Sequence, residues 1–143
     1  MRYLLEVVQV PVSDVDRAKA FYTEKVGFDV DHDTRVGDEL RVVQLTPPES
    51  ACSIVIGTGL SDMEPGSLDG LQLVVPDIRA ARAELVERRL DIGEVQVYDA
   101  DGLRPSRDGD ALDNVGFAFF KDPDGNGWAL QQISARGQQR SSP

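Results

Sequence analysis

Apolar residues dominate both faces of the first strand candidate, and further apolar residues then recur at helical spacing. Residues 3–12 are rich in valine with a two-residue period, which predicts a β-strand. Ser13 or Asp14 is expected to cap the helix that follows, over about residues 15–25. Gly27 is expected to end this helix. The apolar stripe of this helix consists of Ala18, Phe21, Tyr22 and Val26.

Three further strands are predicted at residues 28–35, 39–45 and 52–56, so the order is β-α-β-β-β. Residues 57–69 lack apolar periodicity and are expected to connect two modules. The order then repeats, with a strand at 71–75, a helix opening at Pro76 and Asp77, and strands at 94–98, 115–120 and 128–133. We predict a first module (1–56), a connection (57–69), a second module (70–133) and a flexible tail (134–143).

The two strand-to-helix junctions align with each other. VVQVPVSDVDRA lies beside GLQLVVPDIRAA, which matches Gln9 with Gln72 and Val7 with Gly70. This similarity indicates an internal duplication. The second module ends in FFKDPDGNGWALQQI (119–133), in which two apolar runs flank a group of turn-forming residues. We therefore predict a β-hairpin there, with Asp122 and Asp124 as turn builders rather than catalytic carboxylates.

Composition narrows the possible partners. With 143 residues, 41% of them hydrophobic, the chain has enough apolar material for a core but no run of about 18 apolar residues. Its net charge of −10 repels nucleic acid and anionic lipid headgroups. Cys52 has no partner for an internal disulfide, and we favour a core residue over a catalytic thiol. The N-terminus lacks a signal-peptide cleavage site, so we expect a cytoplasmic protein.

Three segments together, 4–28, 71–90 and 115–133, resemble the vicinal oxygen chelate superfamily, which includes glyoxalase, bleomycin-resistance proteins and extradiol dioxygenases. The resemblance implies an α+β fold of two βαβββ modules, whose curved mixed sheets enclose a cavity. It also implies a homodimer.

Metal-dependent relatives bind a divalent cation through the first and last strands of each module. The resemblance places these four positions at Val7, Ser53, Gly70 and Ala129, where no normal side-chain metal ligand stands. DPDGN is usually followed by a glutamate where this chain has Ala129. We predict no cofactor, and a divalent metal held by nonstandard ligands stays an open alternative. His32 lies among aspartates, and we favour a surface histidine over a ligand.

The remaining candidates form a metal-free pocket with polar anchors. The predicted ligand-binding residues are Gln9, Gln72, Gln131, Ser53 and Arg41, the last only if the third strand turns it inward. The alternatives are that the glutamines cross-link strands and that Arg41 is a surface charge. Four aromatic residues offer apolar walls, although core positions are favoured for them: Phe117, Phe119, Phe120 and Trp128. For the loop 99–113 we favour surface filler over a lid.

The leading hypothesis is a protein that binds a small organic molecule without the family metal. The runner-up is an enzyme of the same fold, a lyase, isomerase or dioxygenase with nonstandard metal ligands or metal-free catalysis. Its catalytic residues are unknown, because no nucleophile can be paired with a base. A regulatory or interaction module is the third class. The expected partners are a small-molecule ligand and a second copy of the chain, with no nucleic acid and no membrane.

Overall fold

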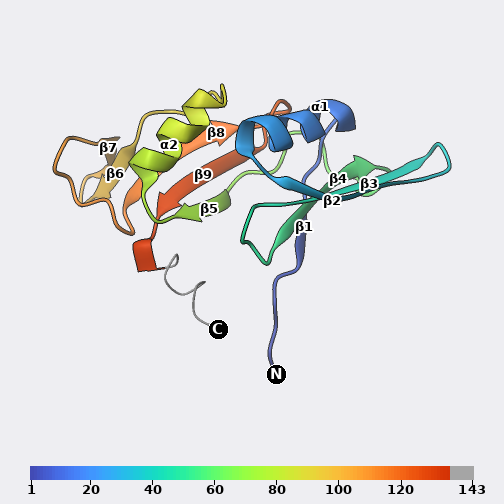
Figure 1. The fold of residues 1–143 in the computed structure, drawn as a ribbon, viewed down its shortest axis with the longest axis horizontal. Helices are drawn as coiled ribbons and strands as arrows, with labels where there is room; N and C mark the ends of the chain where they lie inside the picture. The colour runs from blue at the N-terminus through green and yellow to red at the C-terminus, as the bar shows by residue number, and fades with distance from the viewer. Residues whose placement is uncertain (136–143) are drawn as a thin grey trace. The chain divides into compact units, whose positions relative to one another are not determined.

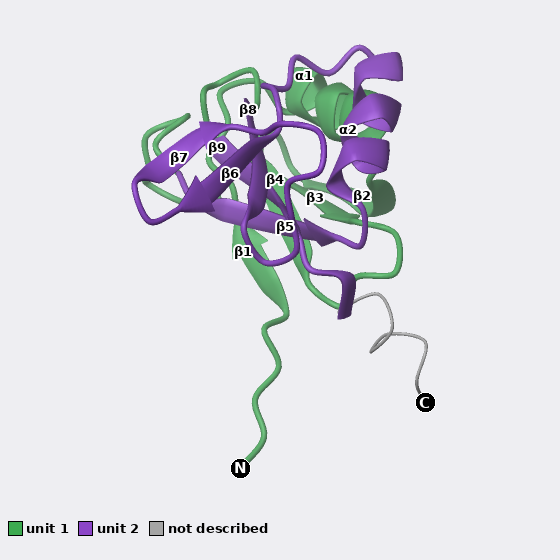
Figure 2. Cartoon of the chain, turned by 90° about the vertical axis from the view of Figure 1, so that its left-hand side faces the viewer, with its two compact units in different colours: residues 1–68, 122–126 green, residues 69–121, 127–143 purple. Residues whose placement is uncertain are grey.

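The computed structural model describes residues 1–135 and divides the chain into two compact units. The first unit contains residues 1–68 and the short segment Asp122–Asn126, and the second contains Asp69–Lys121 and the chain from Gly127 onward (Figure 2). The chain therefore leaves the second unit for five residues and then returns to it. From residue 136 onward, the predicted flexible tail lies outside the described residues.

The first unit has one four-stranded sheet and one helical segment (Figure 1). The strands are β1 (Val7–Gln9), β2 (Asp29–Val36), β3 (Leu40–Thr46) and β4 (Ser53–Thr58), in the order β1-β4-β3-β2. β1 runs parallel to β4, and the other pairs are antiparallel. The prediction of a strand over residues 3–12 is too long, because only three of these residues pair with β4.

The helical segment of the first unit begins at the predicted cap. Asp14 has extended backbone angles, and its carboxylate accepts a 3.0 Å hydrogen bond from the Arg17 amide at the start of α1 (Val15–Ala20). The helix continues as the wider π-helical segment η1 (Phe21–Val26) and ends at Gly27, whose φ of 87° is in the left-handed region. Ala18 and Tyr22 on this segment are fully buried.

The second unit has a five-stranded sheet in the order β5-β9-β8-β6-β7. Its strands are β5 (Leu71–Val75), β6 (Gln96–Asp99), β7 (Gly102–Pro105), β8 (Gly116–Lys121) and β9 (Gly127–Gln132), and its helix is α2 (Ile78–Glu87). Asp77 caps α2 by accepting a 3.2 Å hydrogen bond from the Ala80 amide. The chain is therefore α+β with two mixed sheets, as predicted, although the second sheet has one strand more than expected.

The unexpected strand β7 lies within the segment predicted as the loop 99–113. It forms a hairpin with β6, and its Arg104 guanidinium binds Asp99 at 2.9 Å and Asp110 at 3.0 Å. Hydrogen bonds from Arg104 and from the Arg107 amide lower the pKa of Asp110 to about 2. Neither a lid nor surface filler describes residues 102–105, because they belong to the sheet. A glycine and a proline at the ends of this strand conceal it in the sequence.

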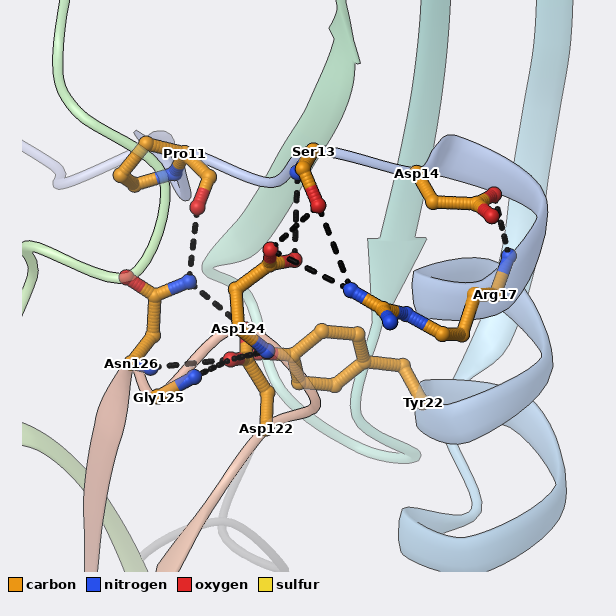
Figure 3. A network of polar contacts seen from close by, with 9 residues as sticks. All are labelled: Pro11, Ser13, Asp14, Arg17, Tyr22, Asp122, Asp124, Gly125 and Asn126. Carbon is orange, nitrogen blue, oxygen red and sulfur yellow. Dashed lines mark hydrogen bonds and ion pairs between the residues drawn. The ribbon is translucent and has the colours of Figure 1, made fainter.

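The turn between β8 and β9 is built around Asp122, which is 5% exposed (Figure 3). Its Oδ1 accepts hydrogen bonds of 3.0, 3.0 and 2.9 Å from the amides of Asp124, Gly125 and Asn126. Its Oδ2 accepts two more, each 2.8 Å, from the Tyr22 hydroxyl and the Asn126 side-chain amide. The prediction that this aspartate builds the turn is confirmed.

Asn126 and Asp124 make further contacts within the first unit that hold the same turn. The fully buried Asn126 amide donates to the Pro11 carbonyl at 2.8 Å. Asp124 accepts hydrogen bonds of 3.1 Å from the Ser13 amide, 2.5 Å from the Ser13 hydroxyl and 3.3 Å from Arg17 (Figure 3). The segment between β1 and α1 and the β8–β9 turn thus satisfy each other's polar groups. Among the described residues, no helix has the length and apolar character needed to cross a membrane.

Replacing Asp122 is expected to destabilise the protein strongly. Asp122→Ala removes the side-chain acceptor of five hydrogen bonds, in a site where several of the groups are buried. We expect the free energy of unfolding to fall by at least about 3 kcal/mol, measured by urea denaturation. Asp108→Ala, at an exposed loop position, is the matched control and should change stability by less than about 0.5 kcal/mol. Equal effects of the two substitutions would contradict the assigned role of Asp122.

Candidate functional site

Each sheet has one face beneath its own helix and one face that the helix leaves uncovered. In the first unit the buried side includes Val43, Leu45, Ile54 and Ile56, which are at most 5% exposed. Strand pairing places the intervening residues on the opposite, uncovered face, because successive side chains alternate. This face carries Val7 and Gln9 of β1, Ser53 and Val55 of β4, Gln44 of β3 and His32 of β2.

A chain of polar side chains crosses this uncovered face. The Gln44 amide nitrogen donates to the Ser53 hydroxyl at 3.2 Å, so its Oε1 is the acceptor in the 3.2 Å contact with His32 Nε2. Thr46 donates its only hydroxyl proton to the Asp31 carboxylate. Ser53 must therefore donate to Thr46 in their 2.6 Å contact. The hydrogen bonds run in one direction, from His32 through Gln44, Ser53 and Thr46 to Asp31.

This direction determines what Ser53 offers to a bound molecule. Its proton is committed to Thr46, so its free lone pair can only accept a hydrogen bond. The second amide proton of Gln44 remains as a donor. Ser53 is only 5% exposed, so it could form part of the floor of a site but does not project from the surface. Of the two roles predicted for Ser53, donor or acceptor of a hydrogen bond to a ligand, only the acceptor role remains.

A cavity of about 280 Å³ lies in the first unit beside Gln9. Gln9 is exposed, and in the described part of the chain its side-chain amide makes no hydrogen bond. The amide therefore retains its full capacity to donate and accept. The cavity is lined by the end of β1, the end of β4 and the connection that follows, including Val55, Gly57, Leu60, Met63 and Pro65.

The two glutamines predicted in the second module lie together on the uncovered face of the second sheet. Gln72 of β5 donates a hydrogen bond from its amide to Oε1 of Gln131 of β9, and Gln131 donates to the Asn114 carbonyl at 2.9 Å. These two glutamines therefore cross-link neighbouring strands, which is the alternative to ligand binding that the sequence suggested. The Oε1 atom of Gln72 accepts no hydrogen bond within residues 1–135 and remains open to a ligand.

Arg41 does not share this arrangement, because β3 turns it to the helix side of its sheet. It is 8% exposed and donates to Asp33 of β2 at 3.0 and 2.8 Å and to Asp16 of α1 at 2.8 Å. The condition attached to its prediction, an inward orientation, is not met, and it is not a free surface charge either. Hydrogen bonds from Arg41 and then Lys19 hold the pKa of Asp33 well below its ordinary value of 3.8.

The four positions that the resemblance assigns to a metal do not fit one. Val7 pairs with Ser53 in the first sheet, but Gly70 precedes β5, and the β5 neighbour of Ala129 is Gln72. Valine, glycine and alanine offer no side-chain lone pair, and one buried serine binds a dication poorly. Within the described residues, no group of three His, Cys, Asp or Glu side chains could hold an ion. The residues present therefore do not support the family's metal chemistry.

Sequence reasoning missed the connecting residues of the polar chain, Gln44, Thr46 and Asp31. The two-residue period of residues 39–45 contained a signal, because Gln44 alternates with the apolar Val43 and Leu45. The prediction of a surface histidine is confirmed, since His32 is exposed on the edge strand β2. Among the aromatic residues, Phe120 and Trp128 are core residues as predicted, both 4% exposed, whereas Phe119 is 39% exposed.

This fold and these faces place the chain in a known class. It belongs to the glyoxalase/bleomycin resistance protein/dioxygenase superfamily, whose family model matches residues 4–130. The chain is similar to the antibiotic-binding protein TnmS3 from Streptomyces sp. CB03234, with 34% identity, a TM-score of 0.70 and coverage of 93% of this chain and 98% of that one.

Two other proteins are also similar to this chain. A glyoxalase/bleomycin resistance protein from Streptomyces sp. CB03234 is 34% identical, with a TM-score of 0.67 and coverage of 90% of this chain and all of that chain. The uncharacterized protein YetH of Bacillus subtilis (strain 168) is 29% identical over 126 residues, which span 87% of this chain and 94% of YetH.

The ion pair of Arg41 predicts a specific response to acid. A carboxylate whose pKa is lowered by folding stabilises the protein above its unfolded pKa of about 3.9, and this contribution disappears as the pH falls. We expect Asp33→Asn to be less stable than wild type at pH 7 and to lose less stability as the pH drops below about 4. Urea midpoints measured from pH 7 to pH 2 test this, with Asp108→Asn as the control. Parallel curves for wild type and Asp33→Asn would contradict it.

Proposed function

We propose that this protein binds a small organic molecule without the family metal. The main supporting observation is the cavity of about 280 Å³ in the first unit, which Gln9 helps to line. Within residues 1–135 the side-chain amide of Gln9 makes no hydrogen bond. Ligand sites combine apolar walls with a few polar groups that orient the ligand. The similarity to a protein described as antibiotic binding supports a small molecule of this kind, as does membership of the superfamily.

The proposed contacts follow from the hydrogen-bonding capacity of each residue. Gln9 would donate to and accept from the ligand, and Ser53 would accept. The second unit has a candidate group of its own: Oε1 of Gln72 accepts no hydrogen bond within residues 1–135, and the side chain is held in place through its bond to Gln131. Arg41 is left out, because its guanidinium is occupied by two carboxylates on the helix side.

No observation favours the enzyme alternative over binding. The Ser53 proton goes to Thr46, and the His32 Nε2 proton goes to Gln44, so serine and histidine do not form a nucleophile and base pair. The Cys52 thiol contacts the Ser53 carbonyl at 3.7 Å. Reversible binding is the simplest function that these groups perform. The cytoplasm remains the proposed location on sequence grounds alone.

The binding proposal predicts a loss of ligand stabilisation on changing Gln9. A panel of antibiotics and aromatic metabolites is screened by thermal shift, where a ligand at about a hundred times its Kd adds about 2.7 kcal/mol of stability. Gln9→Ala should weaken the affinity of a hit about tenfold, because it removes one neutral hydrogen-bonding group. Glu87→Ala, at the exposed end of α2, should leave the affinity unchanged. A panel with no hit, or equal effects of the two variants, would contradict the proposal.

We further propose that the chain forms a homodimer through its N-terminal segment. Tyr3, Leu4 and Leu5 are 83%, 78% and 71% exposed, and they lead into β1, which is an edge strand. Exposed apolar residues beside an unpaired strand edge are costly in a monomer and suited to pairing with another chain. The proposed partners of the protein are thus a small molecule and a second copy of the chain.

The dimer proposal predicts a change of mass in a double variant. Leu4→Ser with Leu5→Ser should lower the molar mass measured by light scattering from that of two chains toward that of one, with folding checked by circular dichroism. Val86→Ser, which changes a 46% exposed apolar residue on α2, serves as the control. Wild-type protein that is monomeric at high micromolar concentration would refute the proposal.

A further inference from the structure

The uncovered face of the second sheet carries a group of apolar side chains, which we name the aromatic platform: Tyr98, Leu103, Phe117 and Phe119. Tyr98 is 56% exposed, Leu103 43% and Phe119 39%. Strand pairing brings them onto one face, because Tyr98 pairs with Leu103 and Gln96 pairs with Phe117. Large exposed apolar groups gathered on one face mark binding sites more often than chance.

The rings of Phe117 and Phe119 are oriented alike. Their planes differ by 5°, and their centroids are 6.2 Å apart. This pair differs from Phe120 and Trp128 on the covered face, whose stacked rings belong to residues that are each only 4% exposed. The two rings are thus parallel, and the 39% exposure of Phe119 leaves aromatic surface on which a planar molecule can stack.

A notch separates the platform from the glutamine pair. Along one row of the sheet, Ala129 of β9 is the paired neighbour of Gln72 on one side and of Phe119 on the other. Adjacent strands lie about 4.8 Å apart, so the glutamine and phenylalanine backbones are separated by roughly 10 Å with only a methyl group between them. This spacing leaves room for an aromatic ring above the Ala129 methyl group.

The residues that form the notch favour a neutral occupant. In a chain with 28% charged residues, the platform residues, Ala129 and the two glutamines are all uncharged, and the charged Lys121 lies one row further along this face, toward the β8–β9 turn. Within residues 1–135 the Gln72 carbonyl oxygen accepts no hydrogen bond, so the notch has a hydrogen-bond acceptor at the edge opposite Phe119. A recess of limited volume suits a small molecule better than the flat surface of a protein partner.

We infer that the notch at Ala129 binds a neutral, planar aromatic molecule that stacks on Phe119 and donates a hydrogen bond from its edge to Gln72. This inference rests on the proposed small-molecule function and names the class of ligand. It assigns Phe119 and Ala129 as specificity-determining residues, the first through its ring and the second through its small size.

The test uses 2-naphthol as the probe and two analogues, its saturated counterpart decahydro-2-naphthol and the anion 2-naphthoate. Protein with ¹³C-labelled alanine methyl groups is titrated and followed by NMR. Stacking should produce a saturable ring-current shift of the Ala129 methyl, and none at Ala118, which is fully buried on the covered face. Both analogues should bind about tenfold more weakly, since one lacks the aromatic face and the other carries a charge.

Variants distinguish stacking from adventitious binding. Phe119→Ala and Ala129→Met, which removes the ring or fills the notch, should each weaken 2-naphthol binding about tenfold, while Val86→Ala leaves it unchanged. No saturable shift, no loss in the Phe119→Ala variant, or equal binding of decahydro-2-naphthol would overturn the inference. An Ala129 shift that follows protein concentration without probe would assign the face to a second copy instead, and would also overturn it.

The outcome is separable from that of the proposed function. If panel ligands lose affinity in Gln9→Ala while 2-naphthol fails to shift Ala129, only the present inference fails. If 2-naphthol binds at Ala129 and Gln9→Ala affects no ligand of the panel, the notch stands and the cavity beside Gln9 is not the site.

Discussion

The carboxylate of Asp122 is the polar group on which the rest of the structure most depends. It collects five hydrogen bonds from its own turn and from Tyr22, and so it determines where β8 ends and β9 begins. The starting point of a strand decides which of its residues face each side of the sheet. Through this turn, Trp128 and Leu130 are buried, and Ala129 and Gln131 are directed to the uncovered face.

The two faces of the first sheet separate charge from hydrogen-bonding capacity. On the helix side, Arg41 is neutralised by Asp33 and Asp16, so its charge is not available to an anionic ligand. On the uncovered side, the chain from His32 to Asp31 consists of short polar side chains whose donors and acceptors point in one direction. A binding surface of this type recognises shape and hydrogen bonds, and it lacks the convergent carboxylates and imidazoles that a cation needs.

The sequence predicted most of the fold because its strand and helix signals are local. The caps Asp14 and Asp77, the exit at Gly27 and the turn at Asp122 lie where residue chemistry placed them. Strand β7 escaped prediction because it is only four residues long and has a glycine and a proline at its ends, which are typical of a loop. Arg41 shares the helix side with Val43 and Leu45 by alternation along β3, but its partners were hidden, since the two carboxylates are 8 and 25 residues away. The direction of the hydrogen bond from Ser53 to Thr46 could not be predicted, because it depends on the contacts of five side chains from three strands.

The central claim is that a superfamily member with valine, serine, glycine and alanine at the expected metal positions works without a metal. It is tested by elemental analysis of protein that was produced in medium supplemented with iron, manganese, nickel and zinc and purified without chelator. Ligand affinity is then compared before and after dialysis against a chelator. The account predicts far less than one ion per chain and the same affinity in both samples. One tightly held ion per chain, with loss of affinity on its removal, would contradict it.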